Sequence, residues 1–295
     1  MSNPEYSISS MTRNDIDIAI DWAANEGWNP GLHDADSFYN ADPGGFLMGR
    51  LDGEPISAIS AIRYGDSFGF IGFYIVKPKY RDLGYGMHIW NVGMAHLEGR
   101  NIGLDGVIEQ QANYKKSNFN LAYRNIRQQG YVEDISKAAF QAKNTGISGN
   151  GFQITDLRDT SFNTIEKYDR QLFPDNRTVF LKSWLRQPEK IALGISKHDE
   201  LYGWGIIRPC REGYKIGPLY ADQPSLAESL FIELTARTIP GSPIFLDTPE
   251  ANSQAISLAS KFHMVPIFET ARMYTGTFPE IPMEKYFGVT SFELG

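Results

Sequence analysis

The order of the expected strands and helices repeats once along the chain, and this repeat constrains the fold more than any other feature. Apolar runs with a period of two predict strands, and apolar stripes with helical spacing predict helices. In the first half, strands are expected at 6–11, 46–50, 55–62, 67–76 and 102–110, with helices at 16–25 and 87–99. In the second half, strands are expected at 152–157, 190–196, 201–208, 214–220, 243–247 and 266–276, with helices at 162–173, 178–187, 226–237 and 253–262. Two copies of one order of strands and helices predict an α/β fold of two similar domains, each a mixed sheet with helices on its faces.

A polar, glycine-bearing stretch separates the two copies. Residues 143–151 read KNTGISGNG, a composition that is typical of a linker. With 295 residues, the chain has the length of two ordinary domains. We therefore expect domains at residues 1–142 and 151–295.

The composition narrows the classes of function. One cysteine, Cys210, provides neither a disulfide framework nor a thiolate metal site, and the five histidines do not pair at metal-ligand spacing. A formal net charge of −7 argues against a nucleic-acid partner and is compatible with amine-bearing ligands. No apolar run approaches the roughly 18 residues of a membrane helix, and no secretion signal is present. We expect a cytoplasmic monomer or homodimer without a metal, membrane or nucleic-acid partner.

The chain places two glycines and an arginine where a strand becomes a helix, in the segment RDLGYG from Arg81 to Gly86. The N–H groups and the dipole of a helix N-terminus favour an anion. Gly84 and Gly86 would let a bulky anion approach the backbone, and Arg81 would add a guanidinium suited to phosphate. The spacing fits neither the Walker loop nor the dinucleotide fingerprint. From these six residues alone, an anion site and a turn without a ligand are about equally well supported.

A longer pattern around this turn resembles the acyl-CoA signature of the GNAT N-acetyltransferase superfamily. The pattern is V-x-P-x-Y-R-x-x-G-x-G, with Asp82 where another glycine is usual, and it comprises Val76, Pro78, Tyr80, Arg81, Gly84 and Gly86. The expected order of elements resembles that fold as well. The stretches 26–31, 104–117 and 268–276 are similar to a bacterial tandem-GNAT group that includes holothin-acyltransferase-like proteins. The resemblance covers nearly the whole chain.

The resemblance implies that the chain binds acetyl-CoA and needs no metal. The residues implied to hold the pyrophosphate are Arg81, Asp82, Leu83, Gly84, Tyr85 and Gly86. The residues implied to pair their backbone with the pantetheine arm are Tyr74, Ile75 and Val76. The asparagine that is usual in the superfamily is absent, because position 107 is valine, and Asn113 is the candidate for that cofactor contact.

The resemblance also implies the catalytic candidates. Tyr114 lines up with the tyrosine that commonly protonates the leaving thiolate, although a tyrosine there can also be a packing residue. Glu109, near the end of a predicted strand, is the first candidate for the base, and Glu26 is the second. Each of these glutamates can instead be a solvated or ion-paired carboxylate. Glu26, Trp28 and Asn29 are the candidates for the acceptor pocket.

The second copy differs at the equivalent turn. The segment LYADQPSL, from Leu219 to Leu226, has neither glycine nor arginine, and Ala259 stands at the tyrosine position. These differences predict a degenerate second domain that does not catalyse. The leading interpretation is an acetyl-CoA-dependent N-acetyltransferase that acetylates a primary amine of a small molecule in its first domain. Two alternatives stay open: a weak or inactive CoA-binding sensor or scaffold, and a protein-lysine acetyltransferase.

Overall fold

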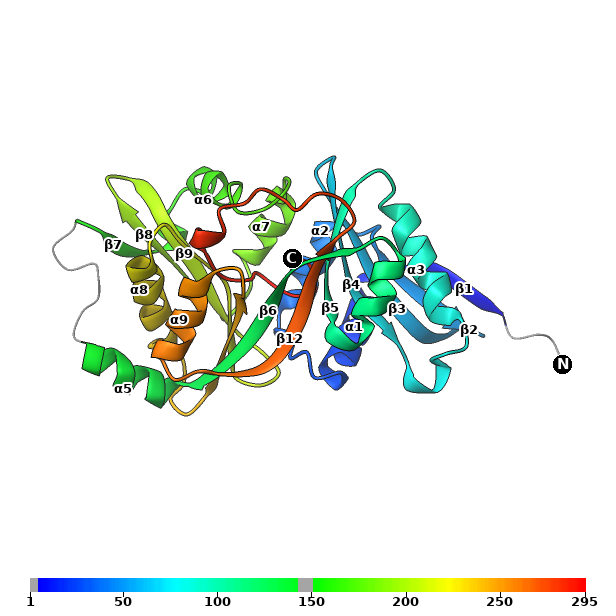
Figure 1. Cartoon of the computed structure of the whole chain (residues 1–295), viewed down its shortest axis with the longest axis horizontal. Helices are drawn as coiled ribbons and strands as arrows, with labels where there is room; N and C mark the ends of the chain where they lie inside the picture. Colours follow the sequence, from blue (N-terminus) through cyan, green and yellow to red (C-terminus); the bar gives the residue numbers. More distant parts are fainter. Residues whose placement is uncertain (1–4, 143–150) are drawn as a thin grey trace.

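The chain forms two halves that share one sheet, seen side by side in Figure 1. The computed structural model describes residues 5–142 and 151–295. The predicted linker at 143–151 lies outside the described residues except for Gly151. The mixed α/β fold and the repeated order of elements agree with the sequence-based prediction.

The first half contains the strands and helices that the periodicity predicts, together with elements for which it predicts no residue range. They are β1 (Tyr6–Ser10), α1 (Arg13–Asn25), α2 (Asp34–Ala41), β2 (Phe46–Leu51), β3 (Glu54–Tyr64), β4 (Phe68–Val76), η1 (Pro78–Tyr80), α3 (Tyr85–His96), β5 (Asn101–Val107), η2 (Ile108–Gln110), α4 (Gln111–Lys116), β6 (Asn120–Tyr131) and α5 (Val132–Ala142). Among the elements without a predicted range are α2, α4, β6 and α5. The strand predicted for 102–110 is wrong at its end. Pairing with the neighbouring strand stops at Val107, and the chain then turns into η2 and α4.

The second half repeats this order. Its elements are β7 (Gln153–Asp156), η3 (Leu157–Asp159), α6 (Phe162–Asp169), α7 (Thr178–Trp184), β8 (Ile191–Lys197), β9 (Glu200–Pro209), β10 (Tyr214–Ala221), α8 (Pro224–Thr235), β11 (Pro243–Pro249), α9 (Ser253–Lys261), β12 (Val265–Tyr274), η4 (Met283–Lys285) and β13 (Tyr286–Gly288). Two of the elements, α5 and β13, lie outside the repeat that the sequence predicts.

The two halves are joined by strands that cross between them. The strand order is β1-β2-β3-β4-β5-β12-β6-β11-β10-β9-β8-β7, with β13 beside β10. Strand β12 of the second half lies between β5 and β6 and pairs antiparallel with both. Strand β6 of the first half pairs with β11 of the second. The expectation of one sheet in each half is therefore corrected, since hydrogen bonds run continuously through the exchanged strands.

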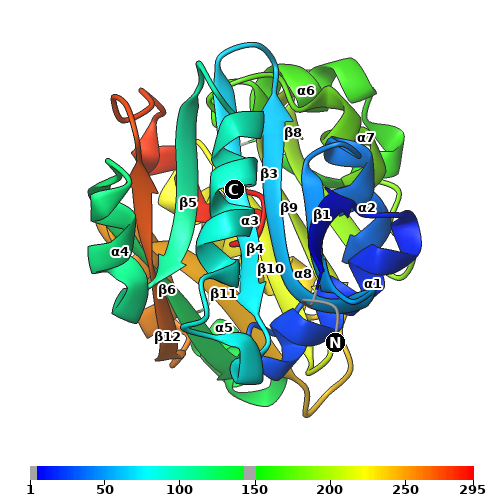
Figure 2. The ribbon, with the colours of Figure 1, turned by 90° about the vertical axis from the view of Figure 1, so that its right-hand side faces the viewer.

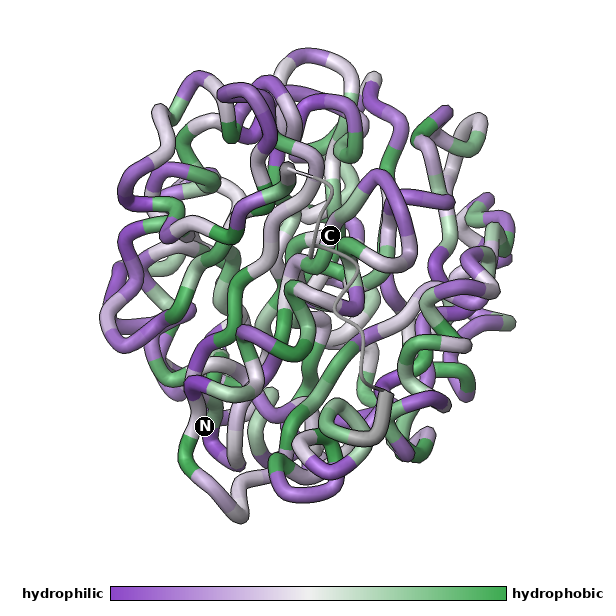
Figure 3. The backbone as a smooth tube through the Cα atoms, turned by 90° about the vertical axis from the view of Figure 1, so that its left-hand side faces the viewer, coloured by the Kyte–Doolittle hydropathy of each residue, from purple (hydrophilic) through white to green (hydrophobic). Residues whose placement is uncertain are grey.

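Helices cover both faces of the sheet. In the first half, α3 packs on β3 and β4, and Figure 2 shows it in front of these strands with α1 and α2 to one side. Apolar residues of α1, among them Ile16 and Ile20, are buried in one cluster with residues of β4, whereas Ile89 and Trp90 of α3 belong to another. Helix α2 also packs against α7 of the second half. The hydropathy of the residues follows this arrangement. Apolar segments gather toward the interior, and hydrophilic segments gather toward the outside (Figure 3).

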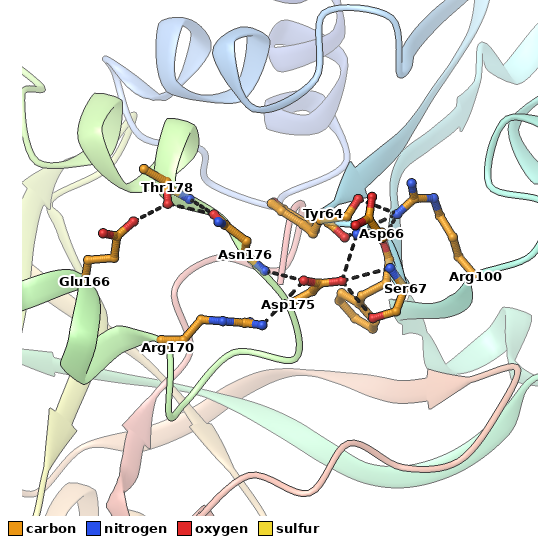
Figure 4. Close-up of polar contacts among 11 residues, drawn as sticks. Tyr64, Asp66, Ser67, Arg100, Glu166, Arg170, Asp175, Asn176 and Thr178 are labelled. Carbon is orange, nitrogen blue, oxygen red and sulfur yellow. Dashed lines mark hydrogen bonds and ion pairs between the residues drawn. The ribbon is translucent and has the colours of Figure 1, made fainter. Parts of the chain in front are cut away.

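Asp175 of the second half binds the turn between β3 and β4 of the first half (Figure 4). Its Oδ2 accepts hydrogen bonds from the backbone N–H groups of Asp66 and Ser67 at 3.1 and 2.8 Å, and from the Ser67 hydroxyl at 2.7 Å. Arg100 donates to three backbone carbonyls of the same turn region. Because the carboxylate satisfies two backbone donors at once, it fixes the turn against the second half.

A buried ion pair also connects the halves. The Arg208 guanidinium donates to both carboxylate oxygens of Asp34, at 2.8 and 3.2 Å, and each side chain is 1% exposed. Burial raises the pKa of the Asp34 carboxyl, but Arg208, Lys215 and the Gly31 N–H together outweigh it, so the net shift is downward. Removing one partner of such a pair is strongly destabilising, because the other charge would remain buried. The pair therefore ties α2 firmly to β9.

Neither a membrane helix nor a cluster of metal-binding side chains is found in 5–142 and 151–295. No helix in these ranges is long and apolar enough to cross a membrane. The same residues contain no group of three or more His, Cys, Asp or Glu side chains placed to hold a metal ion.

Candidate active site

The site lies where β4 and β5 separate. These parallel strands pair from Phe68 with Asn101 to Ile71 with Leu104, and the pairing ends there. Strand β4 also shifts register against β3 between Ala58 and Ser60, and Phe73 has a φ of 46°. Beyond Ile71 the edge of β4 is thus free of β5, and a pocket of about 650 Å³ opens between the strands. A strand edge without a partner offers backbone hydrogen bonds to a ligand.

The N-terminus of α3 forms one end of this pocket. Gly84 is the N-cap residue in a left-handed conformation with a φ of 90°, and no side chain of the described residues caps the helix. The N–H groups of the first helical turn have no partner within a helix, and they carry its positive dipole end. The structure therefore gives the predicted loop the geometry of an anion site.

The two glycines of the loop serve different purposes. A Cβ on Gly84 would meet nothing within 4 Å, so this position needs glycine for its positive φ. A Cβ on Gly86 would lie 2.9 Å from the hydroxyl oxygen of Tyr74. Gly86 thus allows the helix to lie close to β4. Asp82, at the position where the signature has glycine, takes a φ of 61°.

Arg81 stabilises the loop through a hydrogen bond and an ion pair. Its Nε donates to the Val76 carbonyl at 2.9 Å, and its NH2 is paired with the Glu26 carboxylate. Arg81 and Glu26 both line the pocket, so the predicted cofactor residue and the predicted acceptor residue form one ion pair. A direct bond from Arg81 to phosphate stays a prediction.

Tyr114 lies at the pocket and within the core at the same time. It is 8% exposed, and its ring packs beside Trp90 and Phe119 at centroid distances of 5.7 and 6.5 Å. A Cβ on Gly106 would lie 2.2 Å from the Tyr114 ring, so the ring rests directly on β5. Burial raises the pKa of the Tyr114 hydroxyl. A tyrosine hydroxyl is protonated at neutral pH with or without this shift, as a general acid must be before it donates.

The other predicted residues divide into those at the pocket and those away from it. The pocket is lined by Tyr74, Ile75, Val76, Arg81, Asp82, Gly84, Gly86, Glu109, Asn113, Tyr114, Glu26 and Trp28. Leu83 and Tyr85 of the loop do not line it, and the Leu83 side chain is 63% exposed. Asn29 turns to the second half, where its amide exchanges two hydrogen bonds with the backbone of Glu212.

The sequence did not indicate the residues that the second half adds to the pocket. They are Phe268 and Thr270 of β12, and Phe292 and Glu293 near the last residue. Phe268 belongs to a stretch that resembles the family, but residues 280–295 carry no periodic pattern or motif. Their position depends on the exchange of β12 and on the path of the chain after β13.

The equivalent place in the second half is filled. Strands β10 and β11 pair from Tyr214 with Ile244 to Ile216 with Leu246 and then separate, as β4 and β5 do. Strand β13 enters the gap and pairs antiparallel with β10, with Leu219 opposite Gly288. The Tyr286 and Phe287 side chains are buried there. The protein itself thus occupies the opening that a ligand could enter in the first half.

Comparisons with known proteins agree with this fold and site. The family model described as "Acetyltransferase (GNAT) family" matches residues 15–117, and a second, "Acetyltransferase (GNAT) domain", matches residues 165–288. A protein named holothin acyltransferase, from Pseudoalteromonas sp. (strain SANK 73390), is 30% identical over 94% of this chain and 90% of its own. The chain belongs to the GNAT acyltransferase family, with two GNAT domains in tandem.

More distant relatives share the same architecture. An uncharacterized N-acetyltransferase, YitH of Bacillus subtilis (strain 168), is 23% identical over 69% of this chain and 68% of its own. The crystal structure of a putative acetyltransferase from Pyrococcus horikoshii has a TM-score of 0.79 at 21% identity and covers 100% of this chain and 98% of that one. A tandem GNAT protein from the clavulanic acid biosynthesis pathway has a TM-score of 0.60 at 11% identity, over 93% of this chain and all of that one. These structural likenesses show the fold.

The residues at the pocket fit an acyl-CoA. The α3 N-terminus suits a pyrophosphate, the free edge of β4 suits an amide-bearing arm, and Tyr114 stands between β5 and the pocket. Glycine at position 84 provides a backbone that a side chain would not cover.

Proposed function

We propose that the protein is an acetyl-CoA-dependent N-acetyltransferase that acetylates a primary amine of a small molecule. The domains would be residues 1–142 and 151–295, with catalysis in the first. One observation carries the proposal: a single pocket brings together an uncapped helix N-terminus, a free strand edge, a buried tyrosine and several carboxylates. Each is a part that acyl transfer to an amine requires.

The size and the walls of the pocket support a small acceptor. Phe268 and Phe292 of the second half stand beside Trp28 of the first around the same cavity. The walls of the site therefore come from both halves. The relative that covers nearly all of the chain is named for the acylation of one compound, holothin. These observations favour a small molecule over a protein lysine.

Each residue has a defined task in this proposal. The bound acetyl-CoA supplies an acetyl thioester whose carbonyl carbon the amine attacks. The first-turn N–H groups of α3 bind the pyrophosphate, and the backbone of residues 74–76 orients the arm. Tyr114, which lines the pocket, gives its proton to the departing sulfur. A carboxylate of the pocket takes a proton from the acceptor ammonium.

A thiol-release assay tests the proposal. The protein is incubated with acetyl-CoA and a panel of amines that includes phenethylamine, aniline, spermidine and a lysine-containing peptide, and the products are identified by mass spectrometry. We expect CoA release that depends on a small amine, with an amide as the product. Transfer to the peptide alone would favour protein acetylation. Binding of CoA without transfer to any amine would favour the sensor or scaffold.

A further inference from the structure

We propose that Glu293, from the last segment of the chain, is the carboxylate that binds the acceptor ammonium and takes its proton. This inference rests on the proposed function and names a residue for the base. The second half would then complete the active site of the first. Neither Glu109 nor Glu26 would fill that role.

The segment that carries Glu293 is in contact with both halves. After β13, the Val289 N–H donates to the Asp247 carbonyl at 2.9 Å, and the Tyr64 hydroxyl donates to the Leu294 carbonyl at 3.0 Å. A Cβ on Gly72 would lie 2.0 Å from the Glu293 carbonyl oxygen, so the two backbones are in direct contact. Gly72 is the first residue of β4 beyond its pairing with β5. Glu293 therefore stands at the point where the pocket begins.

One oxygen of the Glu293 carboxylate, Oε1, is buried and lacks a hydrogen-bond partner in the described part of the chain. The residue is 3% exposed and lines the pocket. A buried carboxylate oxygen without a donor is costly, and an acceptor ammonium that reached Oε1 from the pocket would supply the missing donor. The two earlier candidates differ, because Glu26 is paired with Arg81 and Glu109 is exposed.

Three buried cations surround this carboxylate at longer range. Arg127 of β6 is paired with Asp247, and Arg208 of β9 is paired with Asp34. The negative charge of Glu293 contributes to raising the pKa of both arginines. Burial lowers the pKa of Lys215 of β10, and the Glu293 carboxylate opposes that shift. The Lys215 ammonium donates to the carbonyls of Asn29 and Trp28. Glu293 could instead serve only to balance the charge of these cations. An experiment must distinguish that structural role from the proposed role as a base.

The proton balance of the step is complete with residues of this pocket. An acceptor ammonium gives one proton to Glu293, and the nitrogen forms its bond to the acyl carbon while the carbon–sulfur bond breaks. The electron pair of that bond leaves on sulfur, which receives the Tyr114 proton. Tyr114 recovers a proton from the acylated nitrogen. Glu293 later releases its proton to solvent, so the net products are an amide, a thiol and one proton.

The first test measures binding without turnover. Phenethylamine and 2-phenylethanol share a skeleton that suits the aromatic walls, and only the amine carries a positive charge. Each is titrated by calorimetry into the protein with CoA. We expect wild type to bind the amine at least about tenfold more tightly than the alcohol, since a hydrogen bond between charged groups contributes roughly 1.5–3 kcal/mol. Glu293→Gln should bind both alike, and Glu284→Gln, an exposed control, should behave as wild type. No preference in wild type would overturn the proposal.

The second test compares amines that differ in their need for a base. Phenethylamine is protonated at neutral pH, whereas aniline is not. In Glu293→Gln, kcat/KM for phenethylamine should fall about 100-fold and rise again with pH, while aniline should be affected much less. Equal losses for both amines, or a larger loss in Glu109→Gln, would refute a base at Glu293. If Glu293→Gln lowers the thermal unfolding midpoint but affects phenethylamine and aniline alike, Glu293 only balances the charge of the buried cations. Wild type without any transfer would instead refute the proposed function, and the binding test would still report on Glu293.

Discussion

The two halves begin with the same opening in the sheet and use it in opposite ways. Beyond Ile71 and Leu104 the strands of the first half leave a pocket, whereas beyond Ile216 and Leu246 those of the second half receive β13. Both openings expose strand edges that need partners. A ligand can supply them in the first half, and the protein supplies them in the second. The same arrangement of strands can thus leave an opening or fill it with a strand of its own.

The turns that follow the two openings also differ in how well they suit an anion. Helix α3 begins at Gly84 with a positive φ and no side-chain cap. Helix α8 begins with Pro224, which has no N–H to donate. Asp222, just before it, accepts a hydrogen bond from the Tyr168 hydroxyl at 2.8 Å and pairs with Lys285. The proline leaves this helix end with fewer N–H groups to offer to a phosphate.

The largest expected effect tests whether the first pocket is catalytic. Tyr114→Phe should lower kcat about 10²–10⁴-fold with little change in the KM for acetyl-CoA, because a positioned acid is lost and binding contacts remain. Tyr131→Phe removes an exposed hydroxyl and serves as the control. Steady-state kinetics measures both variants. A kcat for Tyr114→Phe equal to that of the control would return Tyr114 to a packing role.

A smaller effect is expected when the loop of the first half is changed. Gly84→Val should weaken CoA binding about 100-fold, which corresponds to two hydrogen bonds to a charged group at roughly 1.5 kcal/mol each. Gly53 offers a matched control, since its φ is 84° and a Cβ there also meets nothing within 4 Å. Both valine variants should lose about 1–2 kcal/mol of unfolding free energy. If both bind CoA alike in calorimetry, the loop is not the phosphate site.

A single substitution can disrupt the contact between β4 and the segment that carries Glu293. Gly72→Ala would place a Cβ 2.0 Å from the Glu293 carbonyl oxygen, and the segment would have to move. We expect a loss of about 1–3 kcal/mol in the free energy of unfolding, a typical cost of overpacking. Gly44→Ala, with its nearest neighbours at 3.5 and 3.7 Å, should change stability little. Equal denaturation midpoints for the two variants would argue against the contact.

The smallest expected effect concerns the second half. Asp222→Ala removes the bonds to Tyr168 and Lys285 and should cost roughly 1 kcal/mol of stability. The affinity for CoA and a stoichiometry near one per chain should not change, because β13 still fills the opening. Calorimetric titration measures both quantities. A stoichiometry of two in wild type would contradict the comparison between the halves.

Local patterns were enough to predict most of the fold. Strands such as β4 and helices such as α3 are marked by periods of two and 3.6 residues, and Gly84 marks the turn between them. The loop, the strand edge and Tyr114 were located because they are close together in the sequence and match a family pattern. The end of β5 was misplaced, since the apolar residues Val107 and Ile108 continue the pattern after the pairing stops.

The sequence by itself determined the repeated elements, the family and one wall of the pocket, because these depend on residues near one another along the chain. The tertiary structure decided that β12 enters the first half, that β13 fills the second opening and that Glu293 reaches the pocket. Glu293 and Gly72 lie far apart in the sequence, and no local spacing relates them. Contacts of this kind arise from the pairing of distant strands and from the path of a segment that has no pattern of its own.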